Sequence, residues 1–479
     1  MYNFAMNFTL AQALRVDESN CIACVGSGGK TTALFQLARQ WKPPVIVTAT
    51  SHLGAWQIPL ADRHIVATSQ SDLVNLKKDL DGVMLITGEA KDDKFQPVNH
   101  EIIESLRELC LQHSIPLLIE ADGSRQRLLK GWAEHEPPIP DFVEHVVTVV
   151  GLSGLGKPLT EEYIHRPEIF AELSDTEVGQ IIESNSLTRA LLHDKSSLKN
   201  TPAHARRTVL FNQADTPELQ ASARAMTKML LSKYHSVVIA SLEQGKIFAA
   251  HEPVAGIILA AGESSRYGEP KQLLDWKGEP FVRAVAKRAL EAGLSPLVVV
   301  TGANAEQVES AVKDLAVKIV RNNEWKSGQA SSIRAGILSL TPPPSLPQIR
   351  HGNFDHRESS HVGFGGGARA ERVAEGVGSA IFLLVDQPQI TTSILQALTE
   401  KHAEGLYPIV APMVMDRRAN PVLFDRRTFA DLLTLEGDTG GRAIFHKHKV
   451  EYLPWHDDRL LLDVDTPEHY QRLLADETL

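Results

Sequence analysis

Gly26-Ser-Gly-Gly-Lys-Thr-Thr32 directly follows the apolar run Ile22-Ala-Cys-Val25. A second glycine loop, of different design, is Leu259-Ala-Ala-Gly-Glu-Ser-Ser-Arg-Tyr-Gly-Glu-Pro-Lys271, which follows Gly256-Ile-Ile258. In both places a strand-like run ends in a loop whose backbone N–H groups can surround phosphate oxygens. The two loops lie about half a chain apart, so the sequence predicts two separately folded units that each handle a triphosphate.

Length and composition agree with two units of ordinary globular protein. The 479 residues allow two or three domains at ~100–200 residues each. A hydrophobic content of 43% and a charged content of 23% are typical of such chains. The net charge of −10 argues against a nucleic-acid-binding surface but leaves room for a basic pocket that takes one anionic substrate.

The first residues contain no basic segment followed by a continuous apolar core, which is the pattern of a secretory signal. No apolar run approaches the ~18 residues that a membrane span needs. We therefore expect a cytoplasmic protein that binds neither membrane nor nucleic acid. Three cysteines fit a reducing compartment; Cys21 and Cys24 are expected to be small apolar strand residues, with a redox or metal role as the alternative.

Short β-branched runs alternate with amphipathic stretches through both halves of the chain. The expected strands of the first half are 21–25, 45–50, 83–87, 117–120, 146–150, 209–212 and 236–240, and those of the second are 255–260, 297–301, 317–321, 380–385, 409–413 and 421–424. Such alternation predicts an α/β fold, here two consecutive three-layer α/β domains with ligands at the carboxyl ends of parallel strands.

The domain boundaries follow from where the alternation stops and restarts. We expect an N-terminal P-loop-like nucleotide-binding domain at 1–245, a linker at 246–254 and a C-terminal Rossmann-like domain at 255–479. The stretch 341–378 opens Thr-Pro-Pro-Pro, contains three consecutive glycines and is rich in His, Arg and Glu. This composition predicts a flexible insertion, and its irregularly spaced histidines favour a solvated loop over a metal site.

Each residue type of the first glycine loop suits a phosphate. The glycines Gly26, Gly28 and Gly29 let N–H groups wrap phosphate oxygens, and Lys30 supplies a point charge. Thr31 places a hydroxyl for Mg²⁺, and Thr32 opens a helix whose N-terminus favours anions. A full P-loop has a glycine where this chain has Cys24, so the loop resembles the shorter form found in Mur-type ligases. The alternative is a glycine-rich turn with a solvated lysine.

Two later strand ends fit the same pocket. The run 117–120 ends in Glu-Ala-Asp122, as a second Mg²⁺-binding strand would, and we expect Asp122 to be the ligand. The run 209–212 ends in Asn212-Gln-Ala-Asp215, which resembles the base-reading motif of GTPases except that Gln213 replaces a lysine. The alternatives are that these acids cap helices or turns.

The first half resembles the selenium-dependent molybdenum hydroxylase accessory family (YqeC-like) over roughly residues 15–245. The segments that carry the resemblance are Val25-Gly-Ser-Gly-Gly-Lys-Thr-Thr32, Val47-Thr-Ala-Thr-Ser-His52, Glu120-Ala-Asp-Gly-Ser-Arg125 with Lys130, and Ala133-Glu-His-Glu-Pro137. The family implies a nucleotide-binding step, with ATP or GTP, in the maturation of a molybdenum hydroxylase. By this resemblance the site is lined by His52, Arg125, His135, His165 and Arg166.

The second glycine loop and the charged residues near it suit nucleotidyl transfer. Backbone amides of Leu259, Ala260, Ala261 and Gly262 can face a triphosphate, and Arg266 and Lys271 can neutralise departing pyrophosphate. Carboxylates at two other strand ends, Asp386 and Asp465, suit Mg²⁺. The alternatives are that the two cations are solvated and that Asp465 only caps the helix that starts at Pro467.

The second half resembles the MobA-like nucleotidyltransferases over about 255–475, and in particular their molybdenum cofactor cytidylyltransferase (MocA-like) branch. The carrying motifs, in order, are 259–274, Asn323 with Trp325 and Gly328-Gln-Ala-Ser-Ser332, Asp386-Gln-Pro388, Asn420-Pro-Val-Leu-Phe424, Gly437-Asp-Thr-Gly-Gly-Arg442 and Asp463-Val-Asp-Thr-Pro467. The insertion before the strand 380–385 departs from the pattern.

That resemblance implies a role for each motif. Asp386 and Asp465 hold Mg²⁺, and Arg266 and Lys271 contact phosphates. Nucleotide contacts fall on Ser331 and Ser332, and substrate contacts on Gln387, Asn420, Gly440 and Arg442.

The expected reaction transfers CMP from CTP to the terminal phosphate of molybdenum–molybdopterin, for a client hydroxylase of the xanthine dehydrogenase type. The Leu-Ala-Ala-Gly262 form of the loop resembles the CTP-using branch rather than the GTP-using one. Two alternatives stay open: a transferase with another phosphate acceptor, such as a sugar phosphate, and a non-catalytic carrier that delivers the cofactor to its client.

Overall fold

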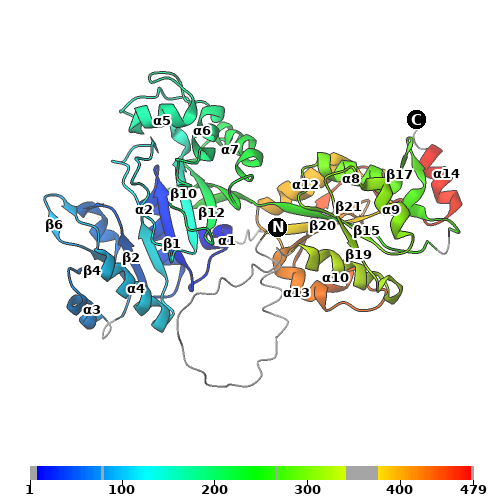
Figure 1. The fold of residues 1–479 in the computed structure, drawn as a ribbon, viewed down its shortest axis with the longest axis horizontal. Helices are drawn as coiled ribbons and strands as arrows, with labels where there is room; N and C mark the ends of the chain where they lie inside the picture. The colour runs from blue at the N-terminus through cyan, green and yellow to red at the C-terminus, as the bar shows by residue number, and fades with distance from the viewer. Residues whose placement is uncertain (1–7, 77–79, 265–266, 341–375, 476–479) are drawn as a thin grey trace. The chain divides into compact units, whose positions relative to one another are not determined.

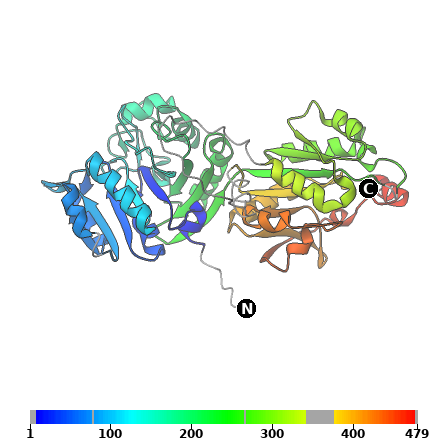
Figure 2. The ribbon, with the colours of Figure 1, turned by 60° about the horizontal axis from the view of Figure 1, so that its bottom comes forward.

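The structure is a computed structural model that describes residues 8–76, 80–264, 267–340 and 376–475. It divides into two compact units, Met1–His251 and Glu252–Leu479, called here the N-terminal and the C-terminal unit (Figures 1 and 2). Arg266 and most of the insertion expected at 341–378 lie outside the described residues. Among the described helices, none has both the length and the apolar character needed to cross a bilayer.

The N-terminal unit is built on a nine-stranded sheet in the order β14-β13-β12-β10-β1-β8-β2-β5-β4. Its strands are β1 (Cys21–Gly26), β2 (Val45–Ala49), β4 (Arg63–Val66), β5 (Val83–Thr87), β8 (Leu117–Glu120), β10 (His145–Gly151), β12 (Arg206–Asn212), β13 (Ser236–Ser241) and β14 (Lys246–His251). Every neighbouring pair is parallel except β13 with β14. The central strands β1, β8 and β10 are buried at every position, as continuous apolar runs require when helices cover both faces.

Helices connect the parallel strands of this sheet. They are α1 (Leu10–Leu14), α2 (Lys30–Gln40), α3 (Gln70–Leu76), α4 (His100–His113), α5 (Pro167–Ser174), α6 (Ser184–Leu192) and α7 (Pro217–Leu230). Short elements complete the unit: strands β3 (Leu53–Gly54), β6 (Ala90–Lys91), β7 (Lys94–Phe95), β9 (Leu129–Lys130) and β11 (Ile164–His165), and 3₁₀ turns η1 (Ala55–Leu60) and η2 (Leu152–Gly154). The start of α4 is set by Asn99, whose side chain accepts a hydrogen bond from the Ile102 N–H.

The linker expected at 246–254 is wrong for most of its length. Residues Lys246–His251 form β14, which pairs antiparallel with β13 and ends the sheet. The run Ile247-Phe-Ala-Ala250 is apolar enough to be partly buried, and its N–H and C=O groups satisfy the edge of β13. Only Glu252 and Pro253 separate β14 from β15, the first strand of the C-terminal unit.

The C-terminal unit contains an eight-stranded sheet in the order β19-β18-β15-β20-β23-β21-β22, with β24 beside β21. Its strands are β15 (Val254–Ala260), β18 (Leu297–Thr301), β19 (Lys318–Arg321), β20 (Ser379–Leu384), β21 (Ile409–Val414), β22 (Arg417–Arg418), β23 (Val422–Asp425) and β24 (Val450–Pro454). β15, β18, β19 and β20 are parallel, so their carboxyl ends lie at one edge of the sheet. β23 runs antiparallel to β20, which the sequence did not predict.

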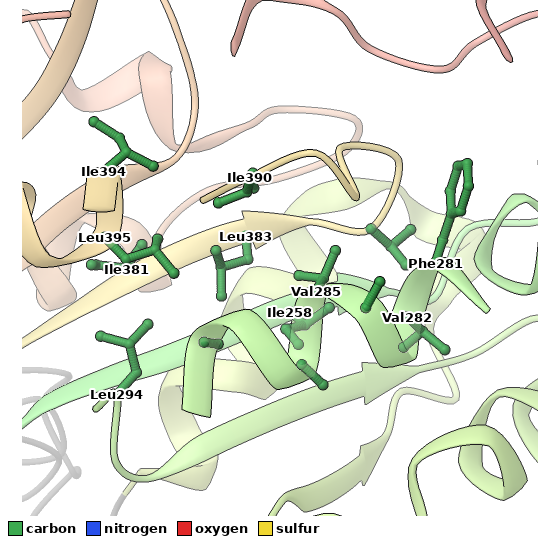
Figure 3. Packing of buried hydrophobic residues seen from close by; sticks show 14 of the residues in the cluster. Ile258, Phe281, Val282, Val285, Leu294, Ile381, Leu383, Ile390, Ile394 and Leu395 are labelled. Atoms are coloured by element: carbon green, nitrogen blue, oxygen red, sulfur yellow. The ribbon is translucent and has the colours of Figure 1, made fainter. Parts of the chain in front are cut away.

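Helices cover both faces of this sheet. They are α8 (Phe281–Glu291), α9 (Ala305–Val312), α10 (Gln329–Ser339), α12 (Thr392–Ala403), α13 (Phe429–Leu433) and α14 (Pro467–Ala475), with the hairpin β16 (Asp275–Trp276) and β17 (Glu279–Pro280) and the 3₁₀ turns η3 (Lys271–Leu273), η4 (Trp325–Ser327), η5 (Arg426–Thr428), η6 (Gly441–Ile444) and η7 (Asp458–Leu461). Alternate residues of β15 enter different cores: Ile258 packs with α8 and α12, as Figure 3 shows, and Ile257 packs with α10 and α13. This unit therefore has three layers.

Candidate functional site

Two acids and one lysine from distant parts of the chain meet at the carboxyl edge of the C-terminal sheet. Lys271 ends the loop after β15, Asp386 follows β20, and Asp465 follows η7. The Lys271 Nζ donates to Asp386 Oδ2 at 3.0 Å and to Asp465 Oδ1 at 2.9 Å. Burial lowers the pKa of Lys271, but the two carboxylates outweigh that effect and raise it, so the amine is charged.

One oxygen of this group remains available to a cation. Asp386 Oδ1 is buried and has no hydrogen-bond partner among the described residues, although Oδ2 is bound by Lys271. A buried carboxylate oxygen without a donor suits a metal ion. The described residues contain no group of three or more His, Cys, Asp or Glu that could hold a metal by themselves. Mg²⁺ commonly binds through one or two carboxylates and takes its other ligands from phosphates and water.

A third acid, Asp463, belongs to this cluster and was not among the predicted site residues. Burial raises its pKa, and the charges of Asp386 and Asp465 raise it further. Gln387 Nε2 donates to Asp463 Oδ1 at 2.6 Å and to the Leu460 carbonyl at 3.4 Å. The side chain of Gln387, predicted to bind substrate, is 1% exposed, and its amide nitrogen orients Asp463, so its contact with substrate stays a prediction.

The loop after β15 is fixed by hydrogen bonds from buried groups, and its backbone is accessible at Gly262. The buried Gln272 donates to the carbonyls of Ala260 and Gly262, at 3.2 and 2.5 Å. The Lys271 N–H donates to Ser264 Oγ. A Cβ on Gly262 would meet no described atom within 4 Å, so the backbone of the predicted Leu259–Gly262 loop is accessible to a ligand at this point.

Ser331 and Ser332, expected to contact the nucleotide, are instead part of the start of α10. Asn322 Nδ2 donates to both hydroxyls, at 2.8 and 3.1 Å, and both serines are buried. Both hydroxyls thus already accept a hydrogen bond from Asn322, and their contact with the nucleotide stays a prediction. Directly before the helix, Gly328 approaches Gly437 so closely that a Cβ on Gly328 would lie 2.3 Å from the Gly437 carbonyl carbon.

A polar cavity opens at the carboxyl ends of β18 and β19. Its volume is about 440 Å³, and its lining includes Asn304, Gln307, Arg321, Asn323 and Trp325. It therefore lies at the same edge of the sheet as the loop after β15 and the strand end that precedes Asp386.

The remaining predicted substrate residues lie at the same edge of the sheet. Asn420 lies two residues before Val422, which pairs with Phe382, so the register brings it opposite the end of β20. Arg442 is exposed, and its charge lowers the pKa of Asp463 against the larger effects of burial and the other acids. Gly440 lies against α10, since a Cβ there would be 2.7 Å from Gln329 Oε1.

In the N-terminal unit, the first glycine loop joins β1 to α2 between the strands β8 and β10. Lys30 is 4% exposed, and its Nζ donates to the Gly26 carbonyl at 2.6 Å and lies 3.2 Å from Asp122 Oδ1. Gly28 lies so close to β10 that a Cβ would be 2.4 Å from Gly151. Thr32 lies in the first turn of α2, as predicted from the loop.

Asp122, predicted to bind Mg²⁺, is surrounded by protein donors. Its carboxylate accepts from the Gly26 N–H, from Lys130 Nζ at 2.9 Å and from Trp132 Nε1 at 3.1 Å. Burial opposes its charge, but Lys30 and Lys130 outweigh burial and lower its pKa. Asp122 therefore holds the loop in place, and its role as a direct metal ligand is not supported by these contacts.

Glu120 is the acid that contacts the predicted metal-binding threonine. Thr31 Oγ1 donates to Glu120 Oε2 at 3.0 Å, and Gln57 also hydrogen-bonds to this carboxylate. Burial is the main cause that raises the pKa of Glu120. The sequence already pointed to this place, since Glu120 ends β8 and Asp122 follows two residues later, but only the structure distinguishes the two acids.

Asn212 and Asp215 differ from the predicted base-reading pair. Asn212 Nδ2 donates to the Gly28 carbonyl at 2.8 Å, and its Oδ1 accepts from the Leu242 N–H at 3.0 Å. Both polar atoms are thus occupied by backbone, and Asn212 supports the loop. Asp215 is exposed and accepts from Ser241 Oγ.

The Glu-His-Glu-Pro motif extends the charged network below the loop. Glu136 binds Lys130, at 3.1 Å, and Arg166. His165 is partly buried, and burial together with nearby cations lowers its pKa to about 4. The other residues expected to line the site, namely His52, Arg125 and His135, have exposed side chains.

Cys21 and Cys24 lie on β1 and are fully buried, and burial raises the pKa of both thiols. High thiol pKa values and burial disfavour the redox alternative, because the thiolate is the reactive form.

Comparison with known proteins gives one family for each unit. A family model described as YqeC protein matches residues 22–168, and one described as MobA-like NTP transferase domain matches residues 256–452. The protein YqeC of Escherichia coli (strain K12) is 30% identical over 206 residues, which cover 40% of this chain and 75% of that protein.

Two further relatives are similar to part of the chain. Nicotine blue oxidoreductase of Paenarthrobacter nicotinovorans is 29% identical over 232 residues, 46% of this chain and 96% of that protein. A probable molybdenum cofactor guanylyltransferase of Bacillus mycoides (strain KBAB4) is 42% identical over 86 residues, 18% of this chain and 40% of that protein. The chain therefore belongs to the YqeC family and carries, fused to that domain, a MobA-like NTP transferase domain with nucleotidyltransferase activity.

Proposed function

We propose that the C-terminal unit transfers CMP from CTP to the terminal phosphate of molybdenum–molybdopterin. The products are molybdopterin cytosine dinucleotide and pyrophosphate, and the dinucleotide serves a client hydroxylase of the xanthine dehydrogenase type. One observation carries the proposal: Lys271 joins Asp386 to Asp465 at the edge where the Leu259–Gly262 loop opens, and Asp386 keeps one oxygen free.

The chain's own groups can position and neutralise a triphosphate. An oxygen of the acceptor phosphate attacks the α-phosphorus of CTP, a new P–O bond forms, and the bond to the β-phosphate breaks. This step needs alignment and charge neutralisation more than covalent catalysis. Backbone N–H groups near Gly262 and the Lys271 amine would bind the phosphates, and Asp386 and Asp465 would hold Mg²⁺. When bound, Mg²⁺ neutralises charge on the triphosphate.

Two features support this choice of substrates. The loop reads Leu-Ala-Ala-Gly262, the form that resembles the CTP-using branch. The Bacillus mycoides relative is named for a molybdenum cofactor substrate and for guanylyl rather than cytidylyl transfer, so it supports the acceptor and leaves the base to be measured. The amides of Asn304 and Asn323 in the 440 Å³ cavity are the groups we assign to the nucleoside.

The main alternatives differ in the acceptor or in the chemistry. A transferase for another phosphate would use the same Lys271, Asp386 and Asp465 group with a different pocket around Asn420 and Arg442. A non-catalytic carrier would bind the cofactor without releasing pyrophosphate. The oxidoreductase name of the Paenarthrobacter relative describes that protein, and here the group of acids and lysine favours phosphoryl chemistry.

For the N-terminal unit we propose a binding site for ATP or GTP at the loop Gly26–Thr32. Thr31 and Glu120 are adjacent at 3.0 Å and would hold Mg²⁺ between them, in place of the buried Asp122. Asn212 keeps the loop in shape from behind. This nucleotide would serve a linked step in cofactor maturation or delivery.

The transferase proposal is tested by giving the full chain each of the four nucleotides in turn. The full chain is incubated with molybdenum–molybdopterin, Mg²⁺ and each of the four NTPs, and the dinucleotide and pyrophosphate are identified by mass spectrometry. Cytosine dinucleotide alone supports the proposal, whereas a guanine dinucleotide overturns the choice of CTP. If a product forms only when another phosphate compound replaces molybdenum–molybdopterin, the proposed acceptor is wrong.

A pair of variants distinguishes the transferase from the non-catalytic carrier. Asp386→Asn should lower pyrophosphate release by at least about a hundredfold, because a metal ligand is lost. Asp314→Asn makes the same chemical change at a side chain that is 60% exposed, and should leave the rate unchanged. Pyrophosphate release by Asp386→Asn at the normal rate would show that this carboxylate is not part of the reaction.

The N-terminal proposal is tested by calorimetry with ATP and GTP. Lys30→Ala should abolish binding, whereas Lys42→Ala, at an exposed position, should not. Because Lys30 pairs with the buried Asp122, thermal unfolding is measured alongside. If Lys30→Ala unfolds, Thr31→Val serves instead. Unchanged nucleotide affinity in a folded variant would contradict the phosphate-binding role of the loop.

A further inference from the structure

The Lys271 amine lies between the two acids that would hold a metal ion. It lies 3.0 Å from Asp386 Oδ2 and 2.9 Å from Asp465 Oδ1. A cation held by both residues must bind oxygens of the same two carboxylates. While the ammonium holds Asp386 Oδ2 and Asp465 Oδ1, those two oxygens are engaged, and its positive charge beside them opposes the approach of a divalent ion.

The surrounding charges favour a cation at this position. Asp463 lies close enough to Asp386 and Asp465 for their charges to raise its pKa, so three acids share one region. Two like charges at close range repel by several kcal/mol when solvent is partly excluded. Lys271 is only 14% exposed and offsets this repulsion, helped at longer range by Arg442.

The lysine is anchored in a way that allows its amine to leave. Its backbone is fixed, because the Lys271 N–H donates to Ser264 Oγ and Lys271 opens η3. Its side chain is a flexible four-carbon stem that carries a compact charge. The amine can therefore turn from the carboxylates toward a phosphate without movement of the loop, whereas Asp386 Oδ1 is already free to accept a first metal contact.

We propose that Lys271 is the resident cation of the metal site and that it exchanges places with the metal when nucleotide arrives. The inference rests on the proposed metal-binding role of Asp386 and Asp465. Before nucleotide binds, Lys271 competes with metal for both acids. With the triphosphate present, its phosphates attract the amine, the acids are released, and the metal enters with the nucleotide. Metal alone therefore binds weakly, and metal with nucleotide binds well.

This arrangement makes an unusual prediction for Lys271→Met, which keeps an unbranched side chain of nearly the same length and removes its charge. Titration of Mn²⁺ without nucleotide, followed by electron paramagnetic resonance and calorimetry, should show at least about tenfold tighter binding than in the unaltered chain. Lys271→Arg keeps the charge and should not gain affinity. Lys277→Met is the matched control, since its amine lies over the Trp276 ring, 5.2 Å from the centroid.

The outcomes separate this inference from the proposed function. If the unaltered chain does not bind Mn²⁺ even with CTP, the metal-dependent function itself fails. If the unaltered chain binds Mn²⁺ with CTP, and Lys271→Met gains no affinity for Mn²⁺ alone, only the exchange is overturned. Thermal unfolding of the variant is measured first; should it not fold, Lys271→Gln replaces it. Addition of Asp386→Asn to Lys271→Met should remove the gain, and a gain that persists would place the metal elsewhere.

Discussion

Gln387 Nε2 lies 2.6 Å from Asp463 Oδ1, although 76 positions separate the two residues in the chain. The amide donates to the one acid of the cluster that Lys271 does not contact. Gln387 is almost fully buried, and its amide nitrogen reaches the site through Asp463. It acts on the site by fixing the position of Asp463 beside Asp386.

Replacement of Gln387 should therefore lower both stability and rate. Gln387→Leu leaves the partly buried Asp463 without this donor, which should reduce the free energy of unfolding by about 1–3 kcal/mol. Displacement of the adjacent acids should lower kcat for pyrophosphate release about tenfold to a hundredfold, with a smaller change in KM for CTP. Urea unfolding and steady-state kinetics measure the two effects. Gln396→Leu, on the exposed side of α12, should change neither, and a normal kcat in Gln387→Leu would contradict a positioning role.

Glu120 should control the metal dependence of nucleotide binding in the N-terminal unit. Glu120→Gln retains an acceptor for the Thr31 hydroxyl and removes the negative charge that a metal requires. ATP or GTP should then bind about equally with and without Mg²⁺, whereas the unaltered chain should bind more tightly with it. Calorimetry in Mg²⁺ and in EDTA gives both affinities. Glu101→Gln, an exposed change, is the control, and a preserved Mg²⁺ effect in Glu120→Gln would assign the metal to another residue.

Gly328 and Gly437 form a matched pair for testing the contact at the start of α10. Both have positive φ, at 105° and 62°, so alanine is strained at either. A Cβ on Gly328 would lie 2.3 Å from the Gly437 carbonyl carbon, whereas one on Gly437 would meet no described atom within 4 Å. Gly437→Ala should cost about 1 kcal/mol and Gly328→Ala about 2–5 kcal/mol of unfolding free energy. Equal values from urea unfolding would show that the two segments are not in tight contact.

His235 should make the N-terminal unit less stable in weak acid. Burial, with smaller effects of Arg206 and Arg207, lowers its pKa from 6.5 to about 4. The unfolded chain therefore gains a proton below pH 6.5 that the folded chain gains only near pH 4. Stability is full above pH 6.5, falls as the pH drops and levels off below pH 4. For this partly exposed side chain we expect a loss of about 1 kcal/mol between pH 7 and pH 5.

The variant His235→Asn tests this assignment. An amide oxygen can replace Nδ1 as acceptor for the Arg207 N–H, which is 3.0 Å away, and it does not titrate. Hydrogen exchange in peptides from β12 and β13 should then depend less on pH than in the unaltered chain. His113→Asn, at an exposed position, should leave the dependence as it is. The same pH dependence in His235→Asn would assign the titration to another group.

Continuous apolar runs allowed most parallel strands to be predicted. β1 and β8 are buried on both faces, so their sequences contain the whole signal. β14 was missed because it follows a turn, which looks like a linker, and because the burial of its second half depends on pairing with β13. β23 was expected as a strand, but its direction depends on contacts with β20 that no local pattern contains.

In the candidate site, too, some features could be predicted from local sequence and others depend on the fold. Lys271, Asp386 and Asp465 could be singled out because each follows an apolar run or glycine loop, and parallel strands bring such ends to one edge. Which polar groups face one another depends on the whole fold and cannot be predicted from a short stretch of sequence. Asp122 and Glu120 have similar sequence positions, and only the fold places donors all around Asp122. Asp463 was missed because its importance comes from its neighbours in space.

The antiparallel pairing of β14 with β13 also determines how the chain can be divided. A fragment that ends at Gly245 would leave the outer edge of β13 as a row of unpaired N–H and C=O groups on a fully buried strand. Such an edge recruits strands from other molecules, so this fragment should form aggregates. A fragment that ends after His251 would keep β13 paired with β14, so Glu252 and Pro253 are where the chain can be cut between the N-terminal and the C-terminal unit.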